Sequence, residues 1–147
     1  KADIAVYRDG SGAPDTFYVL PSSGGAVRAQ NFGDFASDFI IPADFDGDGK
    51  TDYAVWRGGG VGTNGTWYWL RSSDGAFAGQ QFGLGGAFGV RDLPVPGDYD
   101  GDGKTDLAVW RPGAPGVFYH LGLVSGFTQA PFGTTNDTPP AFTLQTR

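Results

Sequence analysis

The chain has 147 residues and a formal net charge of −6, with 26 glycines, 10 prolines and no cysteine. This length fits one domain or part of one, and the abundant glycine and proline argue against a helical protein. The lack of cysteine excludes disulfides and cysteine-based zinc or redox chemistry. No basic stripe and no long apolar run is present, so we expect no nucleic-acid partner and no membrane insertion.

A repeated series of segments begins near the N-terminus. An Ala-Val-aromatic-Arg segment comes first, followed by an aromatic strand, a Ser- and Gly-containing turn, a Phe-Gly pair and a proline-marked strand that begins with Asp. In the first unit these segments are residues 5–8, 16–20, 22–25, 32–33 and 38–43. In the second they are residues 54–57, 66–70, 72–75, 82–83 and 92–97, and in the third they are 108–111, 117–121, 124–126, 132–133 and 137–142.

Four short strands per unit, with the Phe-Gly pairs 50 residues apart, are typical of β-propeller blades. We therefore predict an all-β fold of three four-stranded antiparallel repeats within one domain, residues 1–147. The approximate units are 1–37, 38–91 and 92–136, with a closing strand at 137–147. This arrangement predicts that the C-terminal strand of the same or another chain completes the first blade.

Three blades are fewer than the roughly 4–8 of an ordinary propeller. The chain is then a fragment of a longer propeller, or two chains form a six-bladed ring. In a third alternative, the C-terminal strand of one chain completes the first blade of the next and builds an open fibre.

Two acidic loops, residues 44–52 and 98–106, share the core Asp-Gly-Asp-Gly-Lys-Thr-Asp. Carboxylates this close repel one another, and burying them is unfavourable unless a cation lies among them. A flexible loop that offers only oxygen ligands favours Ca²⁺, at about two ions per chain. The predicted ligands are Asp44, Asp46, Asp48, the Lys50 carbonyl and Asp52 in the first loop, and Asp98, Asp100, Asp102, the Lys104 carbonyl and Asp106 in the second. A solvated acidic turn is the alternative interpretation.

Other candidate sites are weaker. Trp67 and Trp69 lie on one face of a predicted strand with Arg71 beyond them, which makes these three residues candidates for stacking against a sugar ring. Packing between blades is the alternative for the aromatic residues. The Arg that recurs at the end of the Ala-Val-aromatic-Arg segment is expected to be a structural clamp to a neighbouring carboxylate or carbonyl group. No arrangement of Ser, His and Asp predicts catalysis, so we expect no enzyme.

Residues 97–109, together with the recurring Phe-Gly pairs, resemble FG-GAP and VCBS-type repeats. Such repeats form the blades of integrin α-subunit head propellers, of a seven-bladed fungal lectin and of many bacterial surface proteins. The resemblance covers nearly the whole chain and implies Ca²⁺ on an outer loop, an extracellular or cell-surface location, and adhesion or binding. The chain departs from the family in having few blades and no acidic loop before its first one.

We therefore expect a secreted or cell-surface, calcium-binding β-propeller module that recognises carbohydrate or protein, with a glycan or a surface protein as its partner. The first alternative is a structural subunit, a homo-oligomer assembled through its terminal strand into a ring or fibre. The second alternative is an accessory domain of a secreted enzyme.

Overall fold

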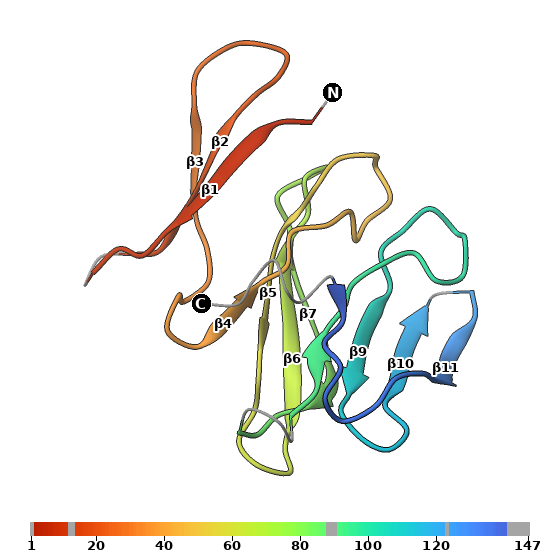
Figure 1. Cartoon of the computed structure of the whole chain (residues 1–147). Coiled ribbons are helices and arrows are strands. Elements are labelled where there is room, and N and C mark those ends of the chain that lie inside the picture. Colours follow the sequence, from red (N-terminus) through yellow and green to blue (C-terminus); the bar gives the residue numbers. More distant parts are fainter. Residues whose placement is uncertain (1, 12–13, 88–90, 123, 141–147) are drawn as a thin grey trace.

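The computed structural model describes residues 2–11, 14–87, 91–122 and 124–140, and within these residues it contains eleven strands in three antiparallel sheets. The sheets follow one another along the chain (Figure 1). This confirms the predicted all-β class and the predicted division into blade-like sheets. None of the three sheets closes on itself within the described residues.

The first sheet has the order β1 (Ile4–Arg8), β2 (Thr16–Leu20), β3 (Arg28–Asn31). The second has the order β4 (Asp38–Ile40), β5 (Tyr53–Arg57), β6 (Asn64–Leu70), β7 (Phe77–Leu84). The third has the order β8 (Leu93–Pro94), β9 (Leu107–Arg111), β10 (Val117–Gly122), β11 (Gly126–Pro131).

The first sheet has three strands where four were expected, because in the described part of the chain no strand pairs with the outer edge of β1. In the other two sheets, a short strand that precedes the acidic loop occupies this position. The closing strand predicted at 137–147 lies mostly outside the described residues, which end at 140.

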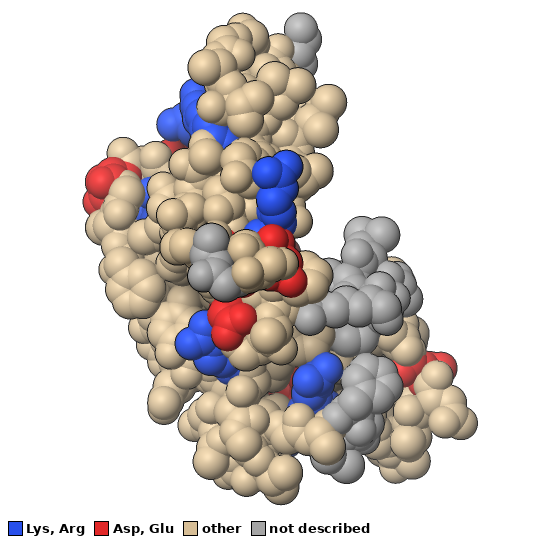
Figure 2. Space-filling view, turned by 90° about the vertical axis from the view of Figure 1, so that its left-hand side faces the viewer, with Lys and Arg blue, Asp and Glu red and all other residues tan. Residues whose placement is uncertain are grey.

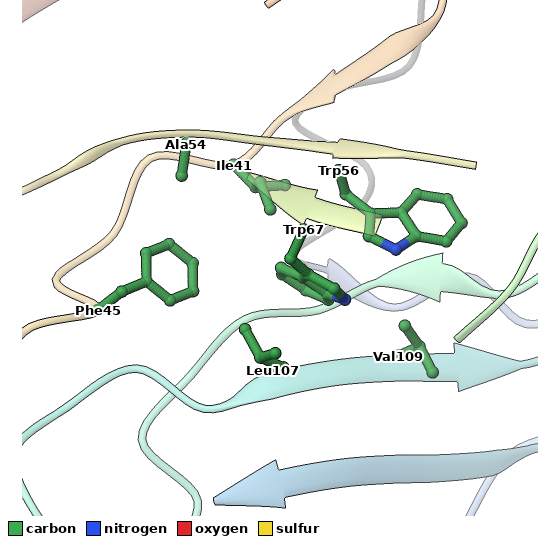
Figure 3. Packing of buried hydrophobic residues seen from close by; sticks show 7 residues of the cluster. All are labelled: Ile41, Phe45, Ala54, Trp56, Trp67, Leu107 and Val109. Atoms are coloured by element: carbon green, nitrogen blue, oxygen red, sulfur yellow. The ribbon is translucent and has the colours of Figure 1, made fainter. Parts of the chain in front are cut away.

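The core lies mainly between the second and third sheets. Trp56 of β5 and Trp67 of β6 are fully buried, and Trp67 points toward Leu107 and Val109 of β9 (Figure 3). Residues 54–56 and 107–110 are buried throughout, because the central strands of both sheets are covered on both faces. Continuous apolar segments are the sequence signature of such strands.

Aromatic contacts join the first sheet to the second. Phe17 of β2 lies 5.2 Å, between ring centroids, from Tyr53 of β5. Phe32, directly after β3, lies 6.4 Å from Phe77 of β7. The sheets therefore pack face to face as neighbouring blades do, and the tight links between them are side chains rather than hydrogen-bonded strands.

Charged side chains are scattered over the face that Figure 2 shows, where basic and acidic groups alternate and form no continuous stripe. The described residues contain no helix long and apolar enough to cross a membrane.

Candidate metal centre in the two acidic loops

Each acidic loop is closed at its base by an antiparallel bridge. The Asp52 amide donates to the Ala43 carbonyl over 2.8 Å, and the Asp106 amide donates to the Gly97 carbonyl over 2.8 Å. The first loop thus joins β4 to β5, and the second joins β8 to β9. The strand pairing fixes where each loop leaves and re-enters its sheet.

The first aspartate of each loop organises the turn. The carboxylate of Asp44 accepts hydrogen bonds from the amides of Gly47 at 2.6 Å and Gly49 at 2.8 Å. Asp98 accepts the equivalent bonds from Gly101 and Gly103. All four glycines have φ between 78° and 86°, a region that residues with a side chain rarely adopt. The glycines therefore let the backbone curl around the first carboxylate.

Three carboxylates gather in each loop. Oxygen atoms of Asp44, Asp46 and Asp48 all lie within 4.8 Å of one another, and so do oxygen atoms of a second set. That second set is Asp98, Asp100 and Asp106. The donors are carboxylate oxygens only, which is the chemistry that Ca²⁺ prefers, so the residues present fit this ion.

The last aspartate of each loop is buried at its base. The carboxylate of Asp52 accepts hydrogen bonds from the Phe45 amide at 2.9 Å and the Ser72 amide at 2.7 Å. Burial raises the pKa of Asp52, and the charges of Asp46 and Asp44 raise it further, whereas the two hydrogen bonds oppose the rise. A cation in the loop would remove this electrostatic conflict.

Asp106 has the same role in the second loop, where it accepts a hydrogen bond from the Tyr99 amide at 2.8 Å. Burial again raises the pKa of Asp106, and the charges of Asp100 and Asp102 act in the same direction. In this loop the buried aspartate also belongs to the carboxylate cluster, whereas Asp52 lies outside the cluster of the first loop.

Two of the predicted ligands, Asp102 and Asp48, each accept a hydrogen bond from the backbone of their own loop. Asp102 lies outside the cluster and accepts a hydrogen bond from the Lys104 amide at 2.8 Å. Asp48 accepts from the Lys50 amide at 2.8 Å, and the Lys50 ammonium group lies 3.3 Å from the same carboxylate. The loops thus share a sequence but differ in which three carboxylates come together.

A second turn supports each loop, and sequence reasoning did not assign it to the site. The hydroxyls of Ser72 and Ser73, between β6 and β7, donate to Asp48 at 2.9 Å and to Asp46 at 2.6 Å. In the third sheet, the Ser125 amide donates to Asp100 at 2.9 Å and lowers the pKa of that carboxyl group. The repeated Ser-Ser pair of the turns was the available signal, but only the fold places it beside the aspartates.

The two acidic loops contact each other. The Thr105 amide donates to the Asp44 carbonyl over 2.7 Å, and the Lys104 side chain packs so closely on Gly47 that a Cβ there would lie 2.8 Å from it. The two candidate sites therefore lie side by side on neighbouring sheets.

The candidate sugar-binding set needs a correction. Trp67 is fully buried and donates its indole N–H to the Phe82 carbonyl at 3.0 Å, so it has no free face for a sugar. Trp69 stacks on Phe45 with ring centroids 5.4 Å apart, and Arg71 forms an ion pair with Asp74 at 2.7 Å. The packing interpretation therefore holds for Trp67, because the third sheet covers that face of β6.

Comparisons with known proteins agree with this architecture. Residues 44–109 match the family model described as an FG-GAP-like repeat, and residues 94–127 match the one described as an FG-GAP repeat. The first match spans both acidic loops, and the second contains the loop at residues 98–106. Searches of curated proteins and of solved structures found no significant match.

Proposed function

This chain contains FG-GAP repeats, and on that premise we propose that it is an extracellular calcium-binding module that recognises a carbohydrate or a protein. FG-GAP repeats form β-propeller-type modules that are often involved in adhesion, are commonly calcium-binding and typically occur in extracellular proteins. The proposal includes binding rather than catalysis, a glycan or surface protein as the partner, and about two Ca²⁺ per chain.

The observation that carries the calcium proposal is the pair of carboxylate clusters at the same place in two successive sheets. The aspartates of each acidic loop have different structural roles in these clusters. Asp44 and Asp98 shape the loops through their glycine amides, while Asp46 and Asp100 link the loops to the supporting turns. When bound, Ca²⁺ would supply the positive charge that these carboxylates lack.

Calcium bound only by the folded state adds its binding free energy to the free energy of unfolding. We therefore expect the melting temperature to rise in Ca²⁺ relative to chelator. In the double variant Asp46→Asn/Asp100→Asn, most of this rise should disappear, while melting in chelator should change little.

The matched control is Asp74→Asn, which removes a carboxylate of the β6–β7 turn that is not part of either cluster. It should keep the full response to Ca²⁺. Equal melting of the parent protein in Ca²⁺ and in chelator, together with no bound Ca²⁺ in equilibrium dialysis, would contradict the proposal.

The recognition proposal is tested by screening the calcium-loaded protein against a glycan array and against cell-surface proteins. Trp69→Ala and Arg71→Ala are the informative variants, because these side chains are only partly buried. An empty screen with well-folded protein would remove the recognition proposal and leave the calcium proposal standing.

A further inference from the structure

The outer edge of β1 differs from the corresponding edges in the other sheets. Val6 of β1 is 55% exposed, whereas its counterparts Val55 of β5 and Val109 of β9 are 1% exposed. β4 pairs with β5 and β8 pairs with β9, but in the described residues nothing pairs with this edge of β1. An apolar strand with an unpaired edge is a template for another strand.

In the second and third sheets, an ion pair joins the two strands at the corresponding edge. Arg57 forms a two-pronged pair with Asp38 at 2.6 and 2.9 Å, and Arg111 forms one with Asp92 at 2.7 and 2.9 Å. Both carboxylates have no exposed side-chain surface. Each aspartate begins the segment that pairs with the arginine's strand.

Half of the same pair is found at each end of the chain. Arg8 of β1 is the counterpart of Arg57, and it lies over the Tyr18 ring without an ion pair among the described residues. Asp137 is the counterpart of Asp38. Its carboxylate accepts the Thr134 amide at 2.7 Å, as Asp38 accepts the Asp34 amide at 2.8 Å, but the described residues offer it no arginine.

The Phe-Gly pairs repeat this complementarity. A Cβ at Gly33 would lie 2.8 Å from Val55, and one at Gly83 would lie 2.8 Å from Val109, so each glycine makes room for the valine of the next sheet. Gly133 faces no such valine in the described structure. Val6, the remaining valine of this series, is exposed on β1.

The aromatic contacts between sheets complete the pattern. Phe32 contacts Phe77 of the next sheet, and Phe82 contacts Phe127 of the next, at ring-centroid distances of 6.4 and 6.3 Å. Phe132 is 75% exposed, and Val27, which has the position of Phe77 in the first sheet, is 57% exposed. In the first two cases a Phe at the end of one sheet contacts an aromatic residue of the next sheet. Phe132 would need a side chain at that position of a following sheet, and Val27 would need a Phe from a preceding sheet, so each could supply the other's contact.

From these three complementary pairs, we propose that a second copy of this chain docks its β1–β3 sheet against the third sheet of the first copy. Asp137 of one copy then pairs with Arg8 of the next, Val6 packs over Gly133, and Val27 packs on Phe132. The first and third sheets lie at opposite ends of the row of sheets in Figure 1, so a contact between them in two copies is head-to-tail. Such a contact gives a ring where it closes and a filament where it does not.

The test is the mass of the full chain by analytical ultracentrifugation over a range of concentrations. The parent protein should associate, while Arg8→Asp and Asp137→Arg should each lower the association constant at least about tenfold, because like charges then face each other. Mixing these two variants should restore association, because every contact in an alternating assembly again joins opposite charges.

Val6→Asp and Val61→Asp form a matched pair, since both valines are exposed but Val61 is outside the proposed contact. Val6→Asp should abolish association and Val61→Asp should preserve it, with circular dichroism and melting temperature confirming that both variants fold. A parent chain that stays monomeric up to its solubility limit would overturn the proposal. So would association that the two charge variants leave unchanged, or that their mixture does not restore.

Calcium does not enter these contacts, so the outcome is separable from the proposed function. Association that occurs equally in Ca²⁺ and chelator supports head-to-tail docking whatever the acidic loops bind. The next repeat of a longer chain is the competing occupant of the β1 edge, and a monomeric parent chain would favour it.

Discussion

Two ion pairs, each with a buried carboxylate and a partly exposed arginine, hold the inner strands of the second and third sheets. Asp92 accepts hydrogen bonds from Arg111 and also, at 2.7 Å, from the Leu84 amide, so one carboxylate joins β8, β9 and the end of β7. The recurrence of Arg after an aromatic residue predicted such a clamp, and the structure confirms it at Arg57 and Arg111. The sequence did not identify the partner, because the carboxylate lies 19 residues earlier in the chain.

Replacing one member of such a pair leaves the other partly buried and uncompensated. We expect Asp92→Ala to lower the free energy of unfolding by about 2–3 kcal/mol, because the Leu84 amide and the Arg111 guanidinium group both lose their acceptor, while Arg111 remains partly hydrated. Asp74→Ala, which breaks the exposed pair with Arg71, should cost less than about 1 kcal/mol. Denaturant unfolding of both variants measures the difference, and similar losses would contradict a structural role for the Asp92–Arg111 pair.

At the scale of elements, the observed strand lengths and contacts differ most from those that the sequence pattern predicted. The aromatic strand predicted at residues 66–70 extends over Asn64–Leu70, because Asn64 pairs with Leu84 beyond an irregularity in the register. The proline-marked strands predicted at residues 38–43 and 92–97 are shorter in the structure, where β4 is Asp38–Ile40 and β8 is Leu93–Pro94. Their pairing with β5 and β9 follows the expected antiparallel order.

The end of β7 shows how closely neighbouring sheets approach. Gly83 has φ +89° and no room for a Cβ beside Val109, whereas Gly75 has φ +70° and open space around it. Gly75→Ala should therefore cost about 1 kcal/mol for its backbone conformation alone. Gly83→Ala should cost about 1–3 kcal/mol more, because Val109 must also move. Thermal and denaturant unfolding of the two variants provide the comparison, and equal losses would argue against this tight contact.

At the scale of the whole molecule, the two acidic loops form one connected region. The hydrogen bond from the Thr105 amide to the Asp44 carbonyl ties the loop of the third sheet to that of the second. Loops that share a backbone hydrogen bond should not loosen independently.

This connection can be tested by hydrogen exchange in Ca²⁺. Asp100→Asn alters only the second loop, yet we expect faster amide exchange in residues 44–52 as well as in residues 98–106. The reciprocal variant, Asp46→Asn, should affect residues 98–106 in the same way. If amide exchange becomes faster only in the loop that carries the substitution, the two loops behave independently.

Repetition and local chemistry were readable from the sequence by itself. The recurrence of apolar, turn and Phe-Gly segments specified strands and blade-like units, and the crowding of aspartates specified a candidate cation site. Both signals are local, because strand periodicity and charge repulsion act between residues close in the chain.

Only the tertiary structure decided which groups meet across sheets. It buried Trp67 beneath the third sheet, brought the serine turn to the acidic loop, and selected Asp106 but not Asp52 for a carboxylate cluster. It also left Arg8 and Asp137 without ion-pair partners among the described residues. These outcomes depend on how whole sheets stack, and stacking is set by packing between side chains far apart in the sequence.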